Sequence, residues 1–291
     1  MILRSYAKVN LCLYVLNKRP DTYHNLDSVF ERINIFDTIG LTQTSGTAIR
    51  LATNSSQIPV DASNLAMRAA KLLQDTCQVK KGVRIVIQKN IPVGAGMGGG
   101  SSNAAAVLVG LNKLWTLRLS VKKLAELGAK IGADVPFFVY NTRFARIRGI
   151  GDLVEPVKAL QKNTLWHVIV TPALHVPTPQ IYKRWDSIKK ARRALTLSQG
   201  NATLMVSALQ KNNLVSIRTY LYNSLERVTI PLYPEIQRIK DRLARSGLGA
   251  VLMSGSGPTV FGIVSSRKEA LFLSRQLKKE RKWSVFAARS V

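Results

Sequence analysis

The first strand of the chain is predicted from an alternation of apolar and other side chains near the amino terminus. From residue 8 to residue 15, apolar side chains occupy every second position. Successive side chains of a strand point to opposite faces, so one face is apolar and the other carries Lys8, Asn10, Cys12 and Tyr14. Lys8 and Asn10 therefore point the same way.

The next segments have helical spacing. Apolar residues recur on one side of a helix from Leu65 to Leu73, and Ser63 or Asn64 can cap its start. Further along, the pattern predicts a strand over 83–87, a helix over 104–115 and a helix from Ser120 to Gly128.

A change of pattern near Leu165 indicates a second unit. We expect a buried strand over 166–170, helices within 201–227 and over 234–246, strands over 250–253 and 259–264, a helix over 268–279 and a strand over 283–288. The chain of 291 residues is long enough for two cores. The prediction is an α+β protein with domains at 1–158 and 159–291.

Charge narrows the choice of partners. Lys and Arg number 43 against 16 Asp and Glu, a formal net charge of +27, which favours anionic partners such as nucleotides, nucleic acid or a membrane surface. The basic segment 183–193 is read as a solvated face rather than a nucleic-acid contact. The size of the excess has no explanation in the sequence.

The cysteines and histidines argue against a disulfide framework and against a protein metal site. Cys12 and Cys77 are far apart, and His24, His167 and His175 do not cluster. No apolar stretch approaches the roughly 18 residues of a membrane helix. We expect a soluble protein of a reducing compartment, the cytoplasm, with no membrane partner.

The segment from Pro92 to Asn103 is the strongest functional signal. It holds five glycines within 94–100 and runs into a predicted helix, so its backbone N–H groups can approach a phosphate closely. A P-loop is excluded because Ser101 and Ser102 follow Gly100 where that motif needs Lys. A dinucleotide fold is excluded because no acidic residue occurs between Gly94 and Glu126.

Three motifs resemble those of one family, the GHMP kinases. The central one is Pro92-x-Gly94-x-Gly96-Met97-Gly98-Gly99-Gly100-Ser101-Ser102-Asn103-Ala104-Ala105. The others are Ala7-Lys8-Val9-Asn10-Leu11 and the segment from Met253 to Phe261. The resemblance spans almost the whole chain and implies a ribosomal protein S5 domain 2-like amino-terminal domain and a ferredoxin-like carboxy-terminal domain.

The resemblance also implies an ATP-dependent kinase that phosphorylates a small alcohol and uses Mg²⁺. It assigns Asp134 as general base and Lys8 as the cation beside it and the transferred phosphate. The implied nucleotide-binding residues are Asn64, Lys89, Pro92, Gly94, Gly96, Gly98, Gly99, Gly100, Ser101 and Ser102. Without the resemblance, Asn64 and the two serines read as helix caps.

Within the family, Asp21-x-Tyr23-His24, the segment 132–136 and Pro177-Thr178-Pro179 are similar to members whose alcohol carries a cytidine diphosphate group. The resemblance implies that Asn10, Tyr23, His24, Thr178 and Tyr182 bind that substrate. One departure bears on this site. Thr22 stands where glycine is usual, and a β-branched residue would be strained if the turn needs φ > 0.

Two alternatives stay open. A kinase of the same family for homoserine, mevalonate or a sugar would share the loop without the cytidine site. An RNA-binding protein without catalysis would also suit a charge of +27, although no RNA-binding aromatic motif supports it and no specific nucleic acid is expected. The oligomeric state, monomer or homodimer, is not fixed by the sequence.

Overall fold

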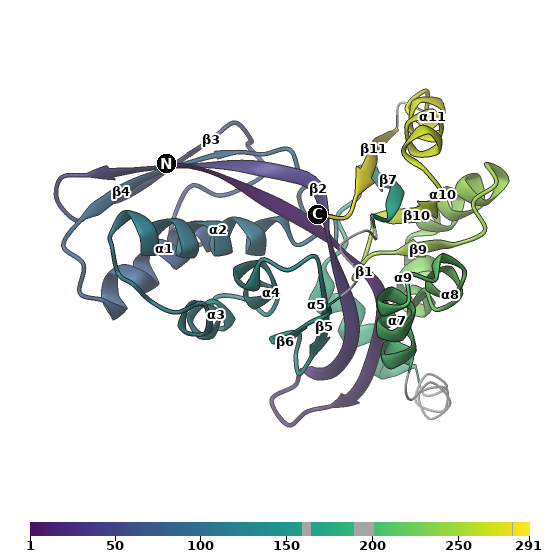
Figure 1. Ribbon diagram of the computed structural model, residues 1–291, viewed down its shortest axis with the longest axis horizontal. Helices are drawn as coiled ribbons and strands as arrows, with labels where there is room; N and C mark the ends of the chain where they lie inside the picture. Colours follow the sequence, from purple (N-terminus) through teal and green to yellow (C-terminus); the bar gives the residue numbers. More distant parts are fainter. Residues whose placement is uncertain (159–163, 189–200, 281) are drawn as a thin grey trace.

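Two β-sheets with helices around them make up the molecule (Figure 1). The computed structural model describes residues 1–158, 164–188, 201–280 and 282–291. In the first sheet the strands lie in the order β3-β4-β2-β1-β8, with β5 paired to β2 and β6 to β5. The bounds are β1 (Ile2–Lys18), β2 (His24–Thr44), β3 (Ile49–Thr53), β4 (Gly82–Gln88), β5 (Phe144–Arg148), β6 (Leu153–Pro156) and β8 (Tyr222–Asn223).

The long antiparallel pair β1 and β2 forms the centre of this sheet. The strand predicted over 8–15 lies inside β1, and Lys8 and Asn10 point the same way, since their side chains are hydrogen-bonded to each other. The second face of β1 is not solvated: Cys12 and Tyr14 are buried in a cluster with Met205 and Leu209 of α7 (Asn201–Gln210). Strands β2 and β3 were not predicted.

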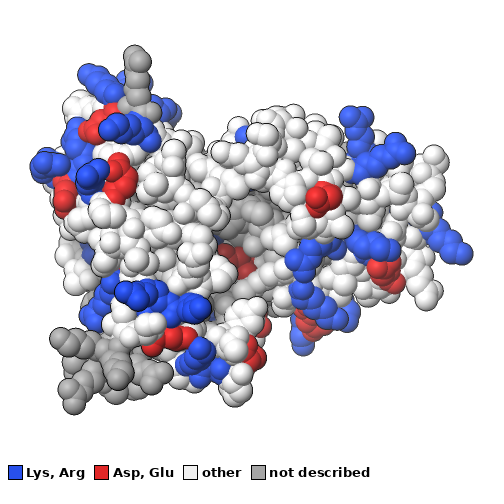
Figure 2. All heavy atoms as spheres, turned by 180° about the vertical axis from the view of Figure 1, so that it is seen from behind, with Lys and Arg blue, Asp and Glu red and all other residues white. Residues whose placement is uncertain are grey.

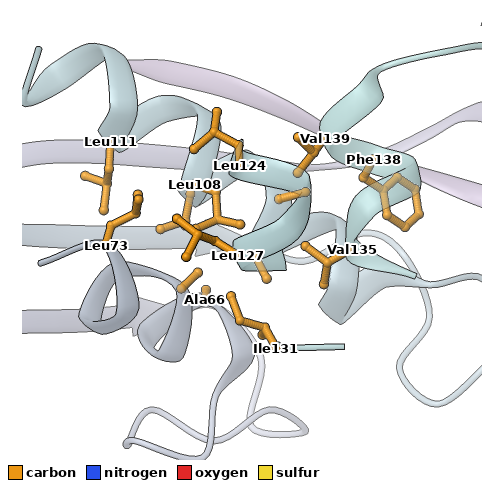
Figure 3. Close-up of a cluster of buried hydrophobic side chains, with 14 of the residues drawn as sticks. Ala66, Leu73, Leu108, Leu111, Leu124, Leu127, Ile131, Val135, Phe138 and Val139 are labelled. Carbon is orange, nitrogen blue, oxygen red and sulfur yellow. The ribbon is translucent and has the colours of Figure 1, made fainter. Parts of the chain in front are cut away.

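Helices α1 (Leu65–Thr76), α2 (Gly99–Leu114), α3 (Val121–Ala129) and α4 (Val135–Tyr140) pack together against the first sheet. Figure 3 shows their apolar side chains converging, among them Leu73, Leu108, Leu127 and Val135. Each fully buried side chain of this size contributes about 1.5–3 kcal/mol. This core holds the start of α2 and the start of α4 in fixed positions.

The predicted start of α2 at Ala104 is wrong, because the helix begins at Gly99. Gly98 precedes it with a left-handed backbone (φ 68°), and the glycines and serines at 99–102 already belong to its first turn. The low helix propensity of these glycines and serines is outweighed by the packing of α2. Helices α1 and α3 begin as predicted, with Asn64 and Ser120 as their caps, whereas α4 was not predicted.

The second sheet is antiparallel, in the order β11-β7-β10-β9. Its strands are β7 (Trp166–Pro172), β9 (Val251–Met253), β10 (Val260–Val264) and β11 (Trp283–Arg289). The helices of this half are α5 (Thr178–Ser187), α7, α8 (Leu214–Thr219), α9 (Glu226–Leu232), α10 (Pro234–Arg245) and α11 (Arg267–Leu277). With strands in this order and helices between β7 and β9 and between β10 and β11, the sheet has the predicted ferredoxin-like arrangement.

The two halves share structure. β8 pairs in parallel with β1, and one buried cluster contains Val9 and Ile33 together with Phe261 and Ala288. The division at 158/159 stays a prediction. Part of the basic segment, residues 189–193, lies outside the described residues. Among the described helices none has the length and apolar character needed to span a membrane.

Candidate active site

The glycine loop connects β4 to α2 and lines a cavity of about 490 Å³. Gly98 occupies the cap position of α2 without any side chain, so the N–H groups of the first turn are left for a ligand. Side chains at the rim come from Ile58, Asn64, Leu65 and Lys89. An apolar rim beside a phosphate-binding helix start suits a nucleotide.

The loop is held from behind by the segment that follows β9. A Cβ atom on Gly96 would lie 2.4 Å from the main-chain oxygen of Ser254, which no side chain can tolerate. The Ser254 hydroxyl donates to the Gly96 carbonyl (3.1 Å) and accepts from the backbone N–H of Asn10 (3.3 Å). Asn223 donates to the carbonyls of Met253 and Gly255. Both halves of the chain therefore shape the loop.

Lys8 and Asp134 meet beside the loop. The Lys8 ammonium lies 3.6 Å from an Asp134 carboxylate oxygen, donates to Asn10 Oδ1 (2.7 Å) and sits 4.1 Å from the centre of the Phe30 ring. Burial lowers the pKa of Lys8, while the nearby Asp134 carboxylate acts in the opposite direction. Asp134 begins α4 without capping it, so its carboxylate is available to a ligand.

Asp134 lines a second cavity, of about 610 Å³, with Tyr23, His24 and Tyr182. Thr178 lines both cavities, so the cavity of the glycine loop and the cavity of the aromatic residues are neighbours. The His24 and Tyr182 rings are stacked, with centroids 5.4 Å apart and an angle of 30° between planes. Burial raises the pKa of the Tyr182 phenol, with a smaller effect from Asp134, and the phenol stays neutral.

The structure brings most of the predicted nucleotide residues to the first cavity. Those that line it are Asn64, Lys89, Pro92, Gly94, Gly96, Gly98, Gly99, Gly100 and Ser101. Ser102 does not line it: the side chain is buried on the other side of the helix, and its hydroxyl accepts from Ser5 (2.7 Å). Asn64 also caps α1, with its Oδ1 2.9 Å from the N–H of Ala66.

Of the predicted substrate residues, Asn10 does not reach the second cavity. It is buried between Lys8 and Ser28, and its amide nitrogen donates to the Ser28 hydroxyl (3.2 Å). Asn10 therefore orients Lys8, and its contact with the substrate stays a prediction. Tyr23, His24, Thr178 and Tyr182 do line the cavity.

Two acidic residues near the cavities were missed. Asp37, fully buried, accepts from Lys89 Nζ (2.5 Å), from Asn103 and from the backbone N–H groups of residues 90 and 91, and so connects the loop to β2. Asp186 lines the second cavity and lies 2.7 Å from His24 Nε2. Neither stands in a motif of its own, so no local signal marked it.

Thr22 has φ +69°, so the turn before Tyr23 does require the left-handed region. The turn is closed by hydrogen bonds from Arg19 N–H to the Tyr23 carbonyl and from Tyr23 N–H to Asp21 Oδ1. Thr22 thus adopts the left-handed conformation that favours glycine, at a cost of about 1–2 kcal/mol in backbone strain.

The surface around the site is mainly basic. Figure 2 shows a hollow in the middle of one face, with acidic atoms inside it and Lys and Arg side chains on the surface to both sides. Such surroundings raise the local concentration of anionic ligands. Among the described residues, no group of three His, Cys, Asp or Glu side chains could hold a metal ion.

Comparison with known proteins agrees with this geometry. The model of the GHMP kinases N terminal domain matches residues 64–142, and that of the GHMP kinases C terminal domain matches 205–282. The 4-diphosphocytidyl-2-C-methyl-D-erythritol kinase of Bacillus velezensis is 45% identical over 89% of this chain and 86% of that protein. Its counterpart from Caldicellulosiruptor saccharolyticus is 41% identical over 96% and 93%.

Solved structures show the same fold. A crystal structure of 4-(cytidine 5'-diphospho)-2C-methyl-D-erythritol kinase superposes with a TM-score of 0.79 at 30% identity, over all of both chains. Homoserine kinase from Cytophaga hutchinsonii has a TM-score of 0.75 at 18% identity, over 100% of this chain and 93% of that one, a likeness of fold alone. With its glycine loop on a nucleotide-sized cavity, two matching family models and near full-length relatives, this chain belongs to the GHMP kinases, ATP-dependent enzymes that phosphorylate an alcohol.

Proposed function

We propose that this enzyme transfers the γ-phosphate of ATP to the 2-hydroxyl of 4-diphosphocytidyl-2-C-methyl-D-erythritol, giving the 2-phosphate and ADP, in the non-mevalonate route to isoprenoids. The observation that carries the proposal is the pair of cavities that meet at Thr178. One is lined by the glycine loop and the other by Tyr23, His24 and Tyr182, with Asp134 facing the second.

Asp134 acts as the base in this proposal. Its carboxylate lines the alcohol-side cavity and accepts the proton of the attacking hydroxyl, a role worth about 10²–10⁴ in rate. Lys8, 3.6 Å away, pairs with that carboxylate and offsets negative charge on the phosphoryl group in transit. Asn10 fixes the Lys8 ammonium in place through its 2.7 Å hydrogen bond.

ATP is placed in the glycine-loop cavity, with its phosphates on the first turn of α2 and its base at the rim near Asn64 and Leu65. Mg²⁺ fits this arrangement as an ion carried mainly by the phosphates, because it commonly keeps its waters and takes only one or two protein ligands. When bound, it neutralises phosphate charge. The Ser101 hydroxyl, which lines the cavity, is the protein ligand we assign to it.

The cytidine end of the substrate is assigned to the aromatic part of the second cavity. Tyr23 is 59% exposed at its rim, a side chain with a free face on which a base can stack. Tyr182 is stacked on His24 and so supports the imidazole from behind. The edge of the imidazole is therefore assigned to the edge of the base, and Tyr182 to holding the imidazole in place.

The test is phosphorylation of 4-diphosphocytidyl-2-C-methyl-D-erythritol, followed by ADP release and by the mass of the product, beside homoserine, mevalonate and a sugar as competitors. We expect kcat/KM for the cytidylyl substrate to exceed that for the others by at least about 10³, since a missing buried recognition group costs several kcal/mol. A preference for one of the other alcohols would refute the proposal. Strong RNA affinity with no ADP release would favour the RNA-binding alternative, whereas a steep loss of RNA binding with added salt would mark nonspecific charge attraction.

The cytoplasm as location and the choice between monomer and homodimer stay predictions. Size-exclusion chromatography with light scattering decides the second.

A further inference from the structure

Asp186 places a carboxylate beside the proposed cytidine site and belongs to none of the sequence motifs. It lies in the last turn of α5 and accepts from His24 Nε2 (2.7 Å) through one oxygen and from Lys18 Nζ (2.5 Å) through the other. A negative charge in the last turn of a helix is disfavoured by the helix dipole. Its position therefore does not serve the stability of α5, and its two partners come from β1 and β2.

The hydrogen bond to Asp186 determines which nitrogen of His24 carries the proton. Burial would raise the pKa of Asp186, but the hydrogen bonds from Lys18 and His24 outweigh it and lower that pKa. The carboxylate is ionised at neutral pH and can only accept, so Nε2 must donate. In the neutral imidazole, Nδ1 is then left without a proton as an acceptor.

The His24 ring cannot turn away from this arrangement. It is 4% exposed, stacked on Tyr182, and it lines the second cavity. Within the described part of the chain, Nδ1 forms no hydrogen bond with protein. Among the three aromatic residues Tyr23, His24 and Tyr182 that line the cavity, Nδ1 of His24 is thus an acceptor held in a fixed position.

We infer that Asp186 is a positioning residue that makes His24 select cytosine over uracil by holding its Nδ1 as an acceptor. The inference rests on the proposed function, because it takes the base to lie against His24. Cytosine presents an exocyclic amino group, a donor, where uracil presents a carbonyl oxygen, an acceptor. Nδ1 as a fixed acceptor can accept a hydrogen bond from the amino group of cytosine. With uracil, Nδ1 and the carbonyl oxygen would be two acceptors facing each other, and a buried hydrogen bond would be lost.

Two measurements test the inference in the full chain. The first is the ¹⁵N chemical shifts of the imidazole nitrogens at neutral pH, with the His24 signals assigned by loss in His24→Gln. We expect the Nε2–H form in the wild type and a mixture of both tautomers in Asp186→Asn. The second is the ratio of affinities for cytidine 5'-diphosphate and uridine 5'-diphosphate by calorimetry, which needs no turnover.

In Asp186→Asn the preference for the cytidine ligand should fall by about tenfold or more, the size of one lost hydrogen bond to a fixed partner, while ATP affinity stays unchanged. Asp75→Asn, the same change at an exposed acid on α1, should leave both readouts unaltered. An Nδ1–H tautomer in the wild type, or an unchanged ligand preference in Asp186→Asn, would overturn the inference. Failure of the wild type to phosphorylate the cytidylyl substrate would instead refute the proposed function, and the imidazole shifts do not depend on it.

Discussion

At the scale of single residues, the main feature of the site is the burial of the Lys8 side chain. Only 5% of its side chain is exposed, and its neighbours are Asn10, Asp134 and the Phe30 ring. The largest effect on its pKa is burial, which disfavours the charged form. A buried charge kept at such a cost fits the role in the reaction proposed for Lys8.

We therefore expect Lys8→Met and Asp134→Asn to lower kcat by about 10²–10⁴ while ATP affinity changes only a few-fold. Lys8→Met should also lower the free energy of unfolding, because it leaves the buried Asn10 Oδ1 without its donor and Asp134 without its cation. Steady-state kinetics, ATP titration and urea denaturation measure the three quantities.

Lys71→Met serves as the control for the same substitution at an exposed position, paired only with Asp75 on α1. It should retain wild-type turnover. Near-normal kcat in both active-site variants would remove Lys8 and Asp134 from the mechanism.

The residue types of the site could be predicted from the sequence, but their partners could not. The alternation over 8–15 placed Lys8 and Asn10 on one side of a strand, and the structure confirms that they touch. Asp186 was missed because its partner His24 lies 162 positions away, and an acid in a helix carries no local signal. At Thr22 the sequence raised the question of whether the turn needs a positive φ. The structure has a positive φ there, although threonine disfavours it.

At the scale of elements, the glycine loop is a rigid piece packed against another loop. Gly96 has φ +72° and its Cα approaches the main chain of Ser254 and Gly257. Such contacts are between backbone atoms, which cannot move aside as a flexible side chain can. The loop therefore has one shape before a nucleotide arrives.

Gly96→Ala should lower the free energy of unfolding by about 1–3 kcal/mol and weaken ATP binding, because the added Cβ adopts a strained backbone and strikes a carbonyl oxygen. Thermal melting and ATP titration test this. The matched change Gly249→Ala, where the Cβ meets nothing within 4 Å and φ is ordinary, should have little effect on either. Equal behaviour of the two variants would mean that the loop relaxes without cost.

Strand β2 was missed for a physical reason. It carries Asp27, Glu31 and Asp37, which break up its apolar run. Each is paired with a residue distant in sequence: Arg146, His167 and Lys89, respectively. Because these ion-pair partners are distant in sequence, the sequence pattern of β2 does not resemble that of a buried strand. Helices α1, α3 and α10 could be predicted from their terminal residues and the periodicity of their apolar residues.

At the scale of the whole molecule, the pair Glu31 and His167 joins the two sheets. Glu31 lies on β2 and His167 on β7, both side chains are fully buried, and their closest atoms are 2.8 Å apart. Glu31 Oε2 and His167 Nδ1 have no hydrogen-bond partner among the described residues. A buried pair of this kind gives little net stability but is costly to break.

We expect His167→Leu to lower the free energy of unfolding by about 3–5 kcal/mol, because Glu31 is then buried without a partner. Adding Glu31→Gln to that variant should recover part of the loss, since a neutral amide is cheaper to bury. Urea denaturation of the single and double variants gives the coupling. Purely additive losses would show that the pair is not coupled.

The contact between Ser254 and Gly96 also determines at which stage of chain synthesis the site can form. The first 158 residues contain the glycine loop, Lys8 and Asp134, yet the loop is braced by a hydroxyl that lies 158 positions downstream of Gly96. During synthesis from the amino terminus, a nascent chain that has completed α4 still lacks this brace. The nucleotide site of this kinase is therefore finished only when nearly the entire chain has been made, so incomplete chains do not carry a fully formed ATP pocket.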